Sequence, residues 1–185
     1  MRRPGEHAVK MDNDVVIHYP GWADVIEEVF ERDPTIGICA LKRRDLGESP
    51  WAEGDAQTVL EMLPHKPRQR WLAVEIARSI IGTCEAFNSL LLDKIGYLVQ
   101  PGVYGFDDAL ASVRCRLAGF RQAYLCGVDI DHVDPGGDAY CAMKRKMAGD
   151  ALSAFNTAVL LYESGGMPLY HGWEGDDETT FSFSC

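Results

Sequence analysis

Short apolar runs alternate with segments of helical periodicity along this chain, and no other sequence feature constrains its fold as strongly. Runs of apolar and β-branched residues predict strands over residues 8–11, 15–17, 36–41, 71–81 and 123–130. Apolar residues spaced three or four apart predict helices over residues 22–32, 89–95, 107–117 and 140–163. Because strands that alternate with helices pack as a sheet covered by helices, we expect an α/β domain with a mixed sheet.

Two segments interrupt this alternation. Residues 43–69 are polar and contain three prolines, which predicts an excursion over the surface with one short helix near residues 56–62. Beyond Gly165 the chain is rich in Gly and Asp, and we expect this tail to lie extended over the surface. At 185 residues the chain suits one domain, with a core over residues 8–150 and the helix end and tail over residues 151–185.

Charge and cysteine content narrow the classes of function. The formal net charge of −10 argues against a general nucleic-acid binder, which needs a basic face to neutralise phosphates. The acidity does not exclude a nucleotide ligand, because one bound metal ion can reverse the local electric field. The alternative is that the negative charge only keeps the protein in solution. The six cysteines form no CxxC pair, which favours reduced thiols in a cytoplasmic protein over a zinc ribbon.

The sequence shows neither a membrane span nor a secretory signal. No run approaches the roughly 20 apolar residues that cross a bilayer. The first residues, MRRPGEHAVK, lack the apolar stretch of a signal peptide. We therefore expect no transmembrane segment.

An acidic turn follows the first predicted strand. Asp12 and Asp14 are one residue apart, so a turn can direct both carboxylates at one hard divalent cation. Mg²⁺ and Mn²⁺ prefer oxygen ligands and often share them with phosphate. The alternative is a surface turn without a ligand. The apolar residues on both sides favour the metal site, because they set the turn at the edge of a core.

A second acidic pair opens the helix predicted over residues 107–117. Asp107 and Asp108 at a helix N-terminus can be no more than caps or partners of the helix dipole. The functional alternative is that one carboxylate faces a ligand crevice as a general base, within hydrogen-bond reach of the proton that it removes.

A histidine follows the last predicted strand. His132 has acids on both sides, at Asp129, Asp131 and Asp134. A histidine in such a setting can be a metal ligand oriented by a neighbouring carboxylate, although a structural histidine is the commoner case. Because the acidic and histidine motifs lie at the ends of separate strand-like segments, they could converge at one edge of the sheet.

In this order the motifs resemble the second half of the inverting GT-A glycosyltransferases of family 2. That family's DxD strand, P-G-W turn and helix, and D-P-x-I-G link are similar to MDNDVVIHYPGWADVIEEVFERDPTIGICALK. Its Gly-led strand pair and short helix are similar to IIGTCEAFNSLLLDKIG, its acidic helix to YGFDDALASVRCRLAGFRQAYL, and its late strand to VDIDHVD. The resemblance covers about residues 8–150 and implies a GT-A-like mixed sheet with flanking helices.

The resemblance also implies roles for single residues. Asp12 and Asp14 would bind the metal and the nucleotide diphosphate, with His132 as a further metal ligand. Asp108 would be the catalytic base, and Asp107 stands where the family usually has Glu. The implied cofactor is Mn²⁺ or Mg²⁺, the donor a nucleotide-diphosphate sugar, and the acceptor a carbohydrate or glycoconjugate.

The same resemblance implies an acceptor site at Gly82, Thr83 and Cys84. Trp22 would pack near the acceptor sugar, with packing in the core as its alternative. Arg114 and Arg116 are expected to be structural partners rather than catalytic groups.

The chain departs from the family pattern in two places. Leu110 stands where the family has a second acid. Family members also carry a nucleotide-binding half before the DxD motif, whereas 11 residues precede Asp12 here, so we expect a partial domain that lacks this N-terminal half. The expected location is the cytoplasm, or a peripheral position at the inner face of the membrane.

These departures keep other functions open beside the sugar transferase. One alternative is a catalytically silent remnant, or a carbohydrate-binding or interaction module that needs another chain. An exposed sheet edge would then favour pairing with that chain or self-association. A metal-dependent phosphohydrolase built on the same acids is a third reading, for which the sequence places no nucleophile.

Overall fold

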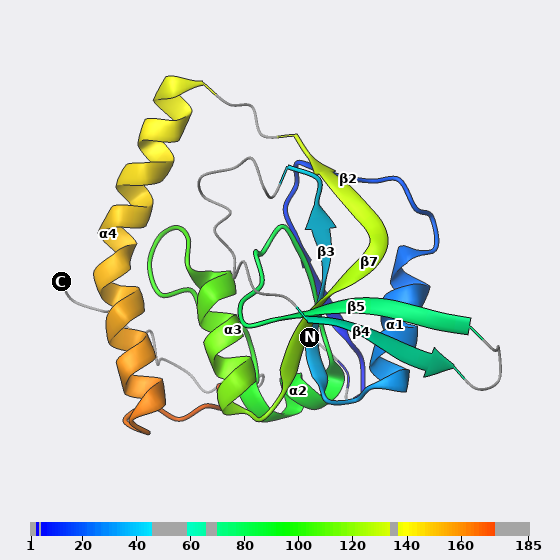
Figure 1. Cartoon of the computed structure of the whole chain (residues 1–185). Helices are drawn as coiled ribbons and strands as arrows, with labels where there is room; N and C mark the ends of the chain where they lie inside the picture. Colours follow the sequence, from blue (N-terminus) through cyan, green and yellow to red (C-terminus); the bar gives the residue numbers. More distant parts are fainter. Residues whose placement is uncertain (1–2, 4, 46–58, 66–69, 134–136, 173–185) are drawn as a thin grey trace.

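The chain forms an α/β domain with a mixed sheet between layers of helices (Figure 1). The computed structural model describes residue 3 and residues 5–45, 59–65, 70–133 and 137–172. In these ranges the sheet has seven strands and is accompanied by four helices. The predicted fold class, α/β with a mixed sheet, is confirmed.

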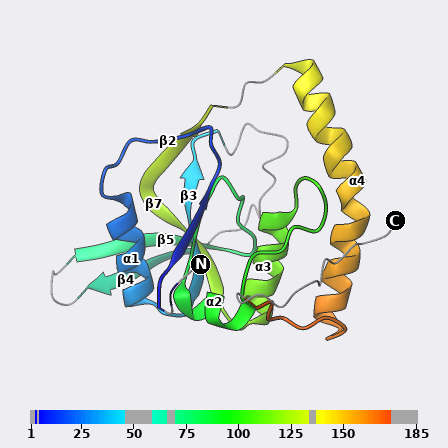
Figure 2. The ribbon, with the colours of Figure 1, turned by 180° about the vertical axis from the view of Figure 1, so that it is seen from behind.

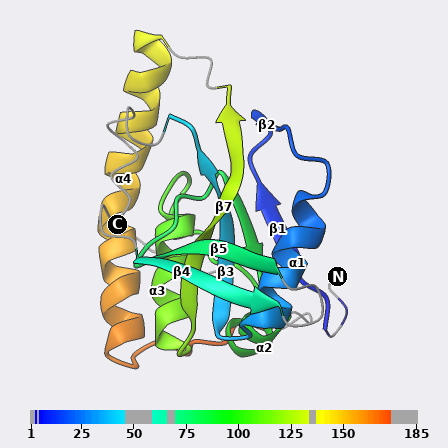
Figure 3. The ribbon, with the colours of Figure 1, turned by 45° about the vertical axis from the view of Figure 1, so that its right-hand side comes forward.

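The strands are β1 (Ala8–Met11), β2 (Val15–Ile17), β3 (Ile36–Arg43), β4 (Val59–His65), β5 (Arg70–Ala77), β6 (Cys84–Phe87) and β7 (Arg121–His132). Their order is β1-β6-β3-β7-β5-β4, and β2 pairs with β7 outside this path. The β3–β7 pair is parallel and the other pairs are antiparallel. β3 and β7 therefore form the centre of the sheet (Figure 3).

Strand β7 serves two partners on one of its edges. Its first half pairs with β5, from Ala77↔Gln122 to Val74↔Leu125. Its second half pairs with β2, from Ile17↔Ile130 to Val15↔His132. Its other edge lies along β3. The end of β7 is thereby brought beside the start of β2, directly after the acidic turn.

The helices cover both faces of the sheet (Figures 1 and 2). α1 (Trp22–Arg32) packs on one face through Ile26, Val29 and Phe30. α2 (Ser89–Ile95) and α3 (Asp107–Leu117) pack on the other face. α4 (Asp138–Glu163) lies outside α3 and packs against it around Leu110. None of the helices in the described ranges combines the length and apolarity that a bilayer crossing requires.

The continuous apolar run of β3 follows from its place between the two helix layers. Cys39 and Leu41 face the α1 side, whereas Ile38 and Ala40 face α2 and α3. A strand buried on both faces needs apolar residues at successive positions rather than at alternate ones. This explains why IGICAL reads as an unbroken apolar stretch.

Most elements match the sequence-based expectation. The first three helices have the predicted bounds, and α4 begins two residues before residue 140. β1 and β2 are as predicted, β3 and β7 are longer, and β5 ends at Ala77 rather than at residue 81.

The helix predicted near residues 56–62 is wrong for the part that the structure describes. Residues 59–62 belong to β4, which forms a hairpin with β5. Leu63 of β4 reaches the core on the α1 side, so burial against distant residues decided the local conformation. Pro64 is tolerated because a proline can occupy an edge strand. Residues 56–58 lie outside the described ranges.

The expectation of an extended surface tail beyond Gly165 is wrong for part of residues 166–172. Met167 and His171 are buried. The His171 N–H donates to Ile95 O at 3.0 Å, and its carbonyl accepts from Tyr97 N–H at 3.0 Å. Gly96 makes this approach possible, because a Cβ there would lie 1.6 Å from the His171 carbonyl oxygen. Residues 173–185 lie outside the described ranges.

Arg114 ties this returning segment to α2 and α3. Its guanidinium is buried and donates to the carbonyls of Tyr97 at 2.9 Å and Leu169 at 2.8 Å, and also to that of Ile95. It also lies over the Tyr162 ring of α4, 5.5 Å from the centroid. Arg114 thus has the structural role expected for it.

Replacing Arg114 with Met is expected to lower the free energy of unfolding by about 2–4 kcal/mol, because three carbonyls lose a charged donor inside the protein. Arg116→Met is the matched control. Among the described residues Arg116 makes one exposed side-chain hydrogen bond, 3.3 Å to Arg78 O, so its loss should change stability by no more than about 0.5 kcal/mol. Urea unfolding measures both variants, and equal losses would contradict this role of Arg114.

Candidate functional site

The acidic turn bridges two different neighbours in the sheet. β1 ends at Met11, and the next N–H, that of Asp12, donates to Thr83 O at 3.0 Å beside β6. β2 begins at Val15, and the Asp14 carbonyl accepts from Val133 N–H at 2.7 Å at the end of β7. Both ends of the turn are fixed by backbone hydrogen bonds, so the two carboxylates have defined positions.

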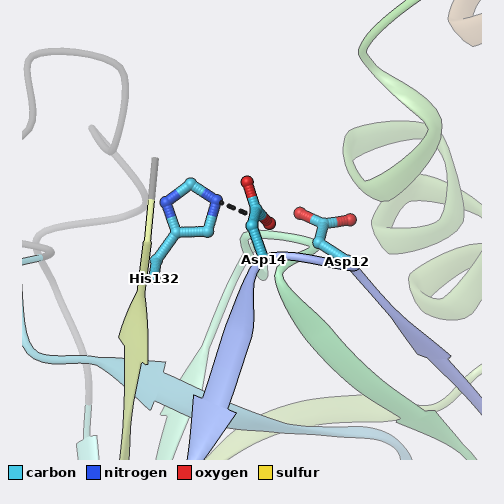
Figure 4. A group of neighbouring side chains, drawn as sticks. All are labelled: Asp12, Asp14 and His132. Carbon is cyan, nitrogen blue, oxygen red and sulfur yellow. Dashed lines mark ion pairs between the residues drawn. The ribbon is translucent and has the colours of Figure 1, made fainter. Parts of the chain in front are cut away.

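The three predicted metal ligands converge at this turn. Asp12, Asp14 and His132 each offer a ligand atom, and these atoms all lie within 4.8 Å of one another (Figure 4). His132 Nε2 lies 3.3 Å from Asp14 Oδ1. Two carboxylates and an imidazole can together coordinate one divalent cation, which makes this group a candidate metal centre.

The position of the His132 ring is set by the burial of its side chain and by the place of its backbone in the sheet. Its side chain is 7% exposed, compared with 25% for Asp14. Its second nitrogen, Nδ1, is buried and has no hydrogen-bond partner among the described residues. The pairing of His132 with Val15 in the β2–β7 ladder fixes the backbone from which the ring projects.

The electrostatics around Asp12 favour a bound cation. The pKa of Asp12 is raised above its ordinary value, mainly by burial. Lys10 and His132 oppose this rise, whereas the carboxylates of Asp14 and Asp107 add to it. A divalent cation would stabilise the charged form of Asp12, which burial and the two carboxylates disfavour.

Asp107 of the second acidic pair lies within electrostatic reach of Asp12. Asp108 Oδ2 accepts a hydrogen bond from Gly82 N–H at 2.9 Å, and its Oδ1 accepts from Ala109 N–H at 2.7 Å. Asp107 Oδ2 lies 2.5 Å from Lys10 Nζ of β1. The N-terminus of α3 is therefore attached to the strand that leads into the acidic turn, and it is also bonded to the segment before β6.

The backbone just before Asp107 has an unusual conformation. Phe106 has φ 63°, the left-handed region that side chains other than glycine rarely adopt. Its ring stacks on that of Phe155 in α4, with centroids 4.8 Å apart. This contact with α4 helps to hold the first turn of α3 where it is.

The predicted acceptor residues divide between this site and the core. Gly82 lies against Asp108 and Lys10, and Thr83 bonds to the backbone of Asp12. Cys84 is buried in the apolar cluster under α1, where burial raises the pKa of its thiol to about 11. Trp22 is partly buried against the same cluster. This is the core packing that we gave as the alternative to a position near the acceptor sugar.

The acids near His132 in sequence do not join the metal group. Asp131 accepts from Arg44 at 2.9 Å and lies 2.6 Å from His18 Nε2. The hydrogen bond with His18 is the main reason why the pKa of Asp131 is lowered. Asp131 therefore belongs to a separate exposed cluster, and Asp134 lies outside the described ranges.

Sequence reasoning missed Lys10 and Glu85, which face each other as a cross-strand pair of β1 and β6. Glu85 is 0% exposed, and burial raises the pKa of its carboxyl to about 8. The available signal was a charged residue inside each of two short apolar strands, AVKM and CEAF. Charged side chains are rare at buried strand positions, so they mark a site when they occur there.

Comparison with protein-family models, with curated proteins and with solved structures found no match to this chain. The proposal for its function therefore depends on the residues themselves.

Gly82→Ala should disturb the junction between α3 and β1. A Cβ at this position would lie 2.7 Å from both Asp108 Cβ and Lys10 Nζ, and we expect a loss of about 1–3 kcal/mol in the free energy of unfolding. Gly149→Ala in α4 is the control, because a Cβ there meets nothing within 4 Å and alanine favours a helix by up to about 1 kcal/mol. Chemical denaturation measures both; a Gly82→Ala variant as stable as the control would refute this close packing.

Proposed function

We propose that this chain is a metal-dependent glycosyltransferase of the GT-A type, similar to family 2, which moves a sugar from a nucleotide-diphosphate donor to an acceptor hydroxyl with inversion. The observation that carries the proposal is the convergence of Asp12, Asp14 and His132 within 4.8 Å. The acids at the N-terminus of α3 support it, because Asp107 contributes to the raised pKa of Asp12.

The metal group accounts for donor binding in this proposal. Asp12, Asp14 and His132 would hold Mn²⁺ or Mg²⁺ and share it with the diphosphate of the donor. When bound, the cation supplies positive charge that stabilises the leaving nucleoside diphosphate. Five free cysteines among the described residues fit the reducing cytoplasm that we propose as the location.

Asp108 is the proposed general base. Hydrogen bonds from two backbone N–H groups, those of Gly82 and Ala109, fix the position of its carboxylate. It would take the proton from the acceptor hydroxyl as that oxygen attacks the anomeric carbon and the bond to the diphosphate breaks. Asp107 is paired with Lys10, so Asp108 is the better placed of the two acids for this role.

One observation favours a second candidate function, an interaction module. β1 ends the strand order, and within the described ranges its ladder partner is β6 alone. Its Val9 and Met11 are 48% and 51% exposed. An edge strand with exposed apolar side chains can pair with another chain or a second copy, which would suit a remnant that is silent alone.

Metal titration separates these two functions. Wild-type protein should bind Mn²⁺ in calorimetry and bind a nucleotide-diphosphate sugar only when Mn²⁺ is present. Asp14→Asn should weaken Mn²⁺ binding by at least about tenfold, because it removes one charged ligand. Asp24→Asn, an exposed acid of α1, is the control and should leave the affinity unchanged. Equal Mn²⁺ affinity in the two variants would reject the metal centre and favour the interaction module.

The base assignment has its own test. Asp108→Asn should reduce sugar transfer by about 10²–10⁴-fold, because the acceptor proton loses its base. Mn²⁺-dependent nucleotide-sugar binding should stay within twofold of wild type, since Asp108 is not a metal ligand in this proposal. Released nucleoside diphosphate measures transfer over a panel of donors. Unchanged turnover in Asp108→Asn would reject Asp108 as the base.

A further inference from the structure

Lys10 projects from β1 into a group of acceptor atoms at the N-terminus of α3. Its Nζ lies 2.5 Å from Asp107 Oδ2, 3.3 Å from Gly82 O and 3.9 Å from Glu85 Oε2. Asp108 also acts on its charge. A primary ammonium has three donors and no acceptor, and here the Gly82 carbonyl and the Asp107 carboxylate lie close enough to accept from it.

Glu85 is the least expected member of this group. Both of its carboxyl oxygens are buried, and neither has a hydrogen-bond partner among the described residues. A buried polar group without a partner is costly, so its retention requires a reason. Its nearest cation is Lys10 Nζ, which is too distant for a hydrogen bond. A cation bound more deeply than Lys10 would give Glu85 the donor that it lacks.

Acidic side chains outnumber the cation at this point of the structure. Asp12, Glu85, Asp107 and Asp108 all interact electrostatically with Lys10. The metal group accounts for Asp12 but not for Glu85, Asp107 and Asp108, because among the described residues the atoms that converge closely enough for one ion are those of Asp12, Asp14 and His132. The remaining acids suit a larger cation that binds through hydrogen bonds.

Lys10 can leave this group without opening the core. Its side chain is 28% exposed, and that of Asp107 is 25% exposed. Rotation of the Lys10 side chain into solvent would remove its ammonium from Asp107, the Gly82 carbonyl and Glu85. Gly82 keeps this space open, because a Cβ there would lie 2.7 Å from Lys10 Nζ.

We propose that Lys10 occupies a binding site for the primary ammonium group of a ligand, formed by Asp107, Glu85 and the Gly82 carbonyl. The ammonium of the ligand replaces Lys10 Nζ and donates to all three groups. This site adjoins Asp108, so the ligand is an amino sugar that acts as the acceptor. The acceptor assignment rests on the proposed glycosyltransferase function, whereas ammonium binding does not.

Calorimetry with three small probes tests the site, without metal or donor. The probes are glucosamine, glucose and n-butylamine. Lys10→Met removes the resident ammonium and should increase glucosamine affinity at least tenfold, with no change for glucose. Lys10→Met combined with Glu85→Gln should reverse most of that gain. No gain for glucosamine, or an equal gain for glucose, would overturn the site. Glucosamine should also bind more tightly than n-butylamine, and equal binding would overturn the amino-sugar assignment.

A measurement on the wild-type protein covers the case in which the variants fold poorly. The ¹⁵N resonance of the Lys10 ammonium should shift when glucosamine is added and stay unchanged with glucose. An unchanged Lys10 resonance at saturating glucosamine would reject displacement. Mn²⁺ binding is measured separately: if it is retained without an amine response, this inference alone fails, and if the amine response is retained without Mn²⁺ binding, the proposed function alone fails.

Discussion

The division of β7 between two partners is the constraint on which the rest of the structure depends. One edge of this strand is completed first by β5 and then by β2, while β3 runs along the other edge. Backbone donors and acceptors inside a sheet must be paired, so β2 has to return to the end of β7. That return places Asp14 beside His132, although 118 positions separate them in the numbering, and leaves Asp12 on the side of β6.

Local patterning explains how much of this fold could be predicted. α1 has a clear apolar stripe, and α3 carries acids in its first turn and arginines in its last, so both helices could be recognised from sequence. β4 could not, because VLEMLPH forms a strand only through its pairing with β5. The returning segment around His171 was missed for a similar reason: its partners, Gly96 and Arg114, lie far away in the chain.

The residues of the candidate site also divide into those that local patterning could identify and those that it could not. The acids of the metal group and of α3 could be selected because their types and spacing carry chemical meaning, and the structure places them near one another. The relation of Lys10 to Glu85 could not be read from either residue alone. It depends on the antiparallel alignment of β1 with β6, which sets the two side chains opposite each other, and on the burial of Glu85, whose oxygens find no hydrogen-bond partner in the described part of the chain.

The stacking of Phe106 on Phe155 links the conformation of Asp107 and Asp108 to the position of α4. The left-handed backbone conformation of Phe106 costs on the order of 1–3 kcal/mol, and packing of its ring against α4 offsets that cost. If α4 detached, Phe106 would relax toward a common backbone conformation, and the first turn of α3 would loosen with it. Order in Asp107 and Asp108 is in this sense thermodynamically coupled to the docking of a helix that contributes no acid to the metal group.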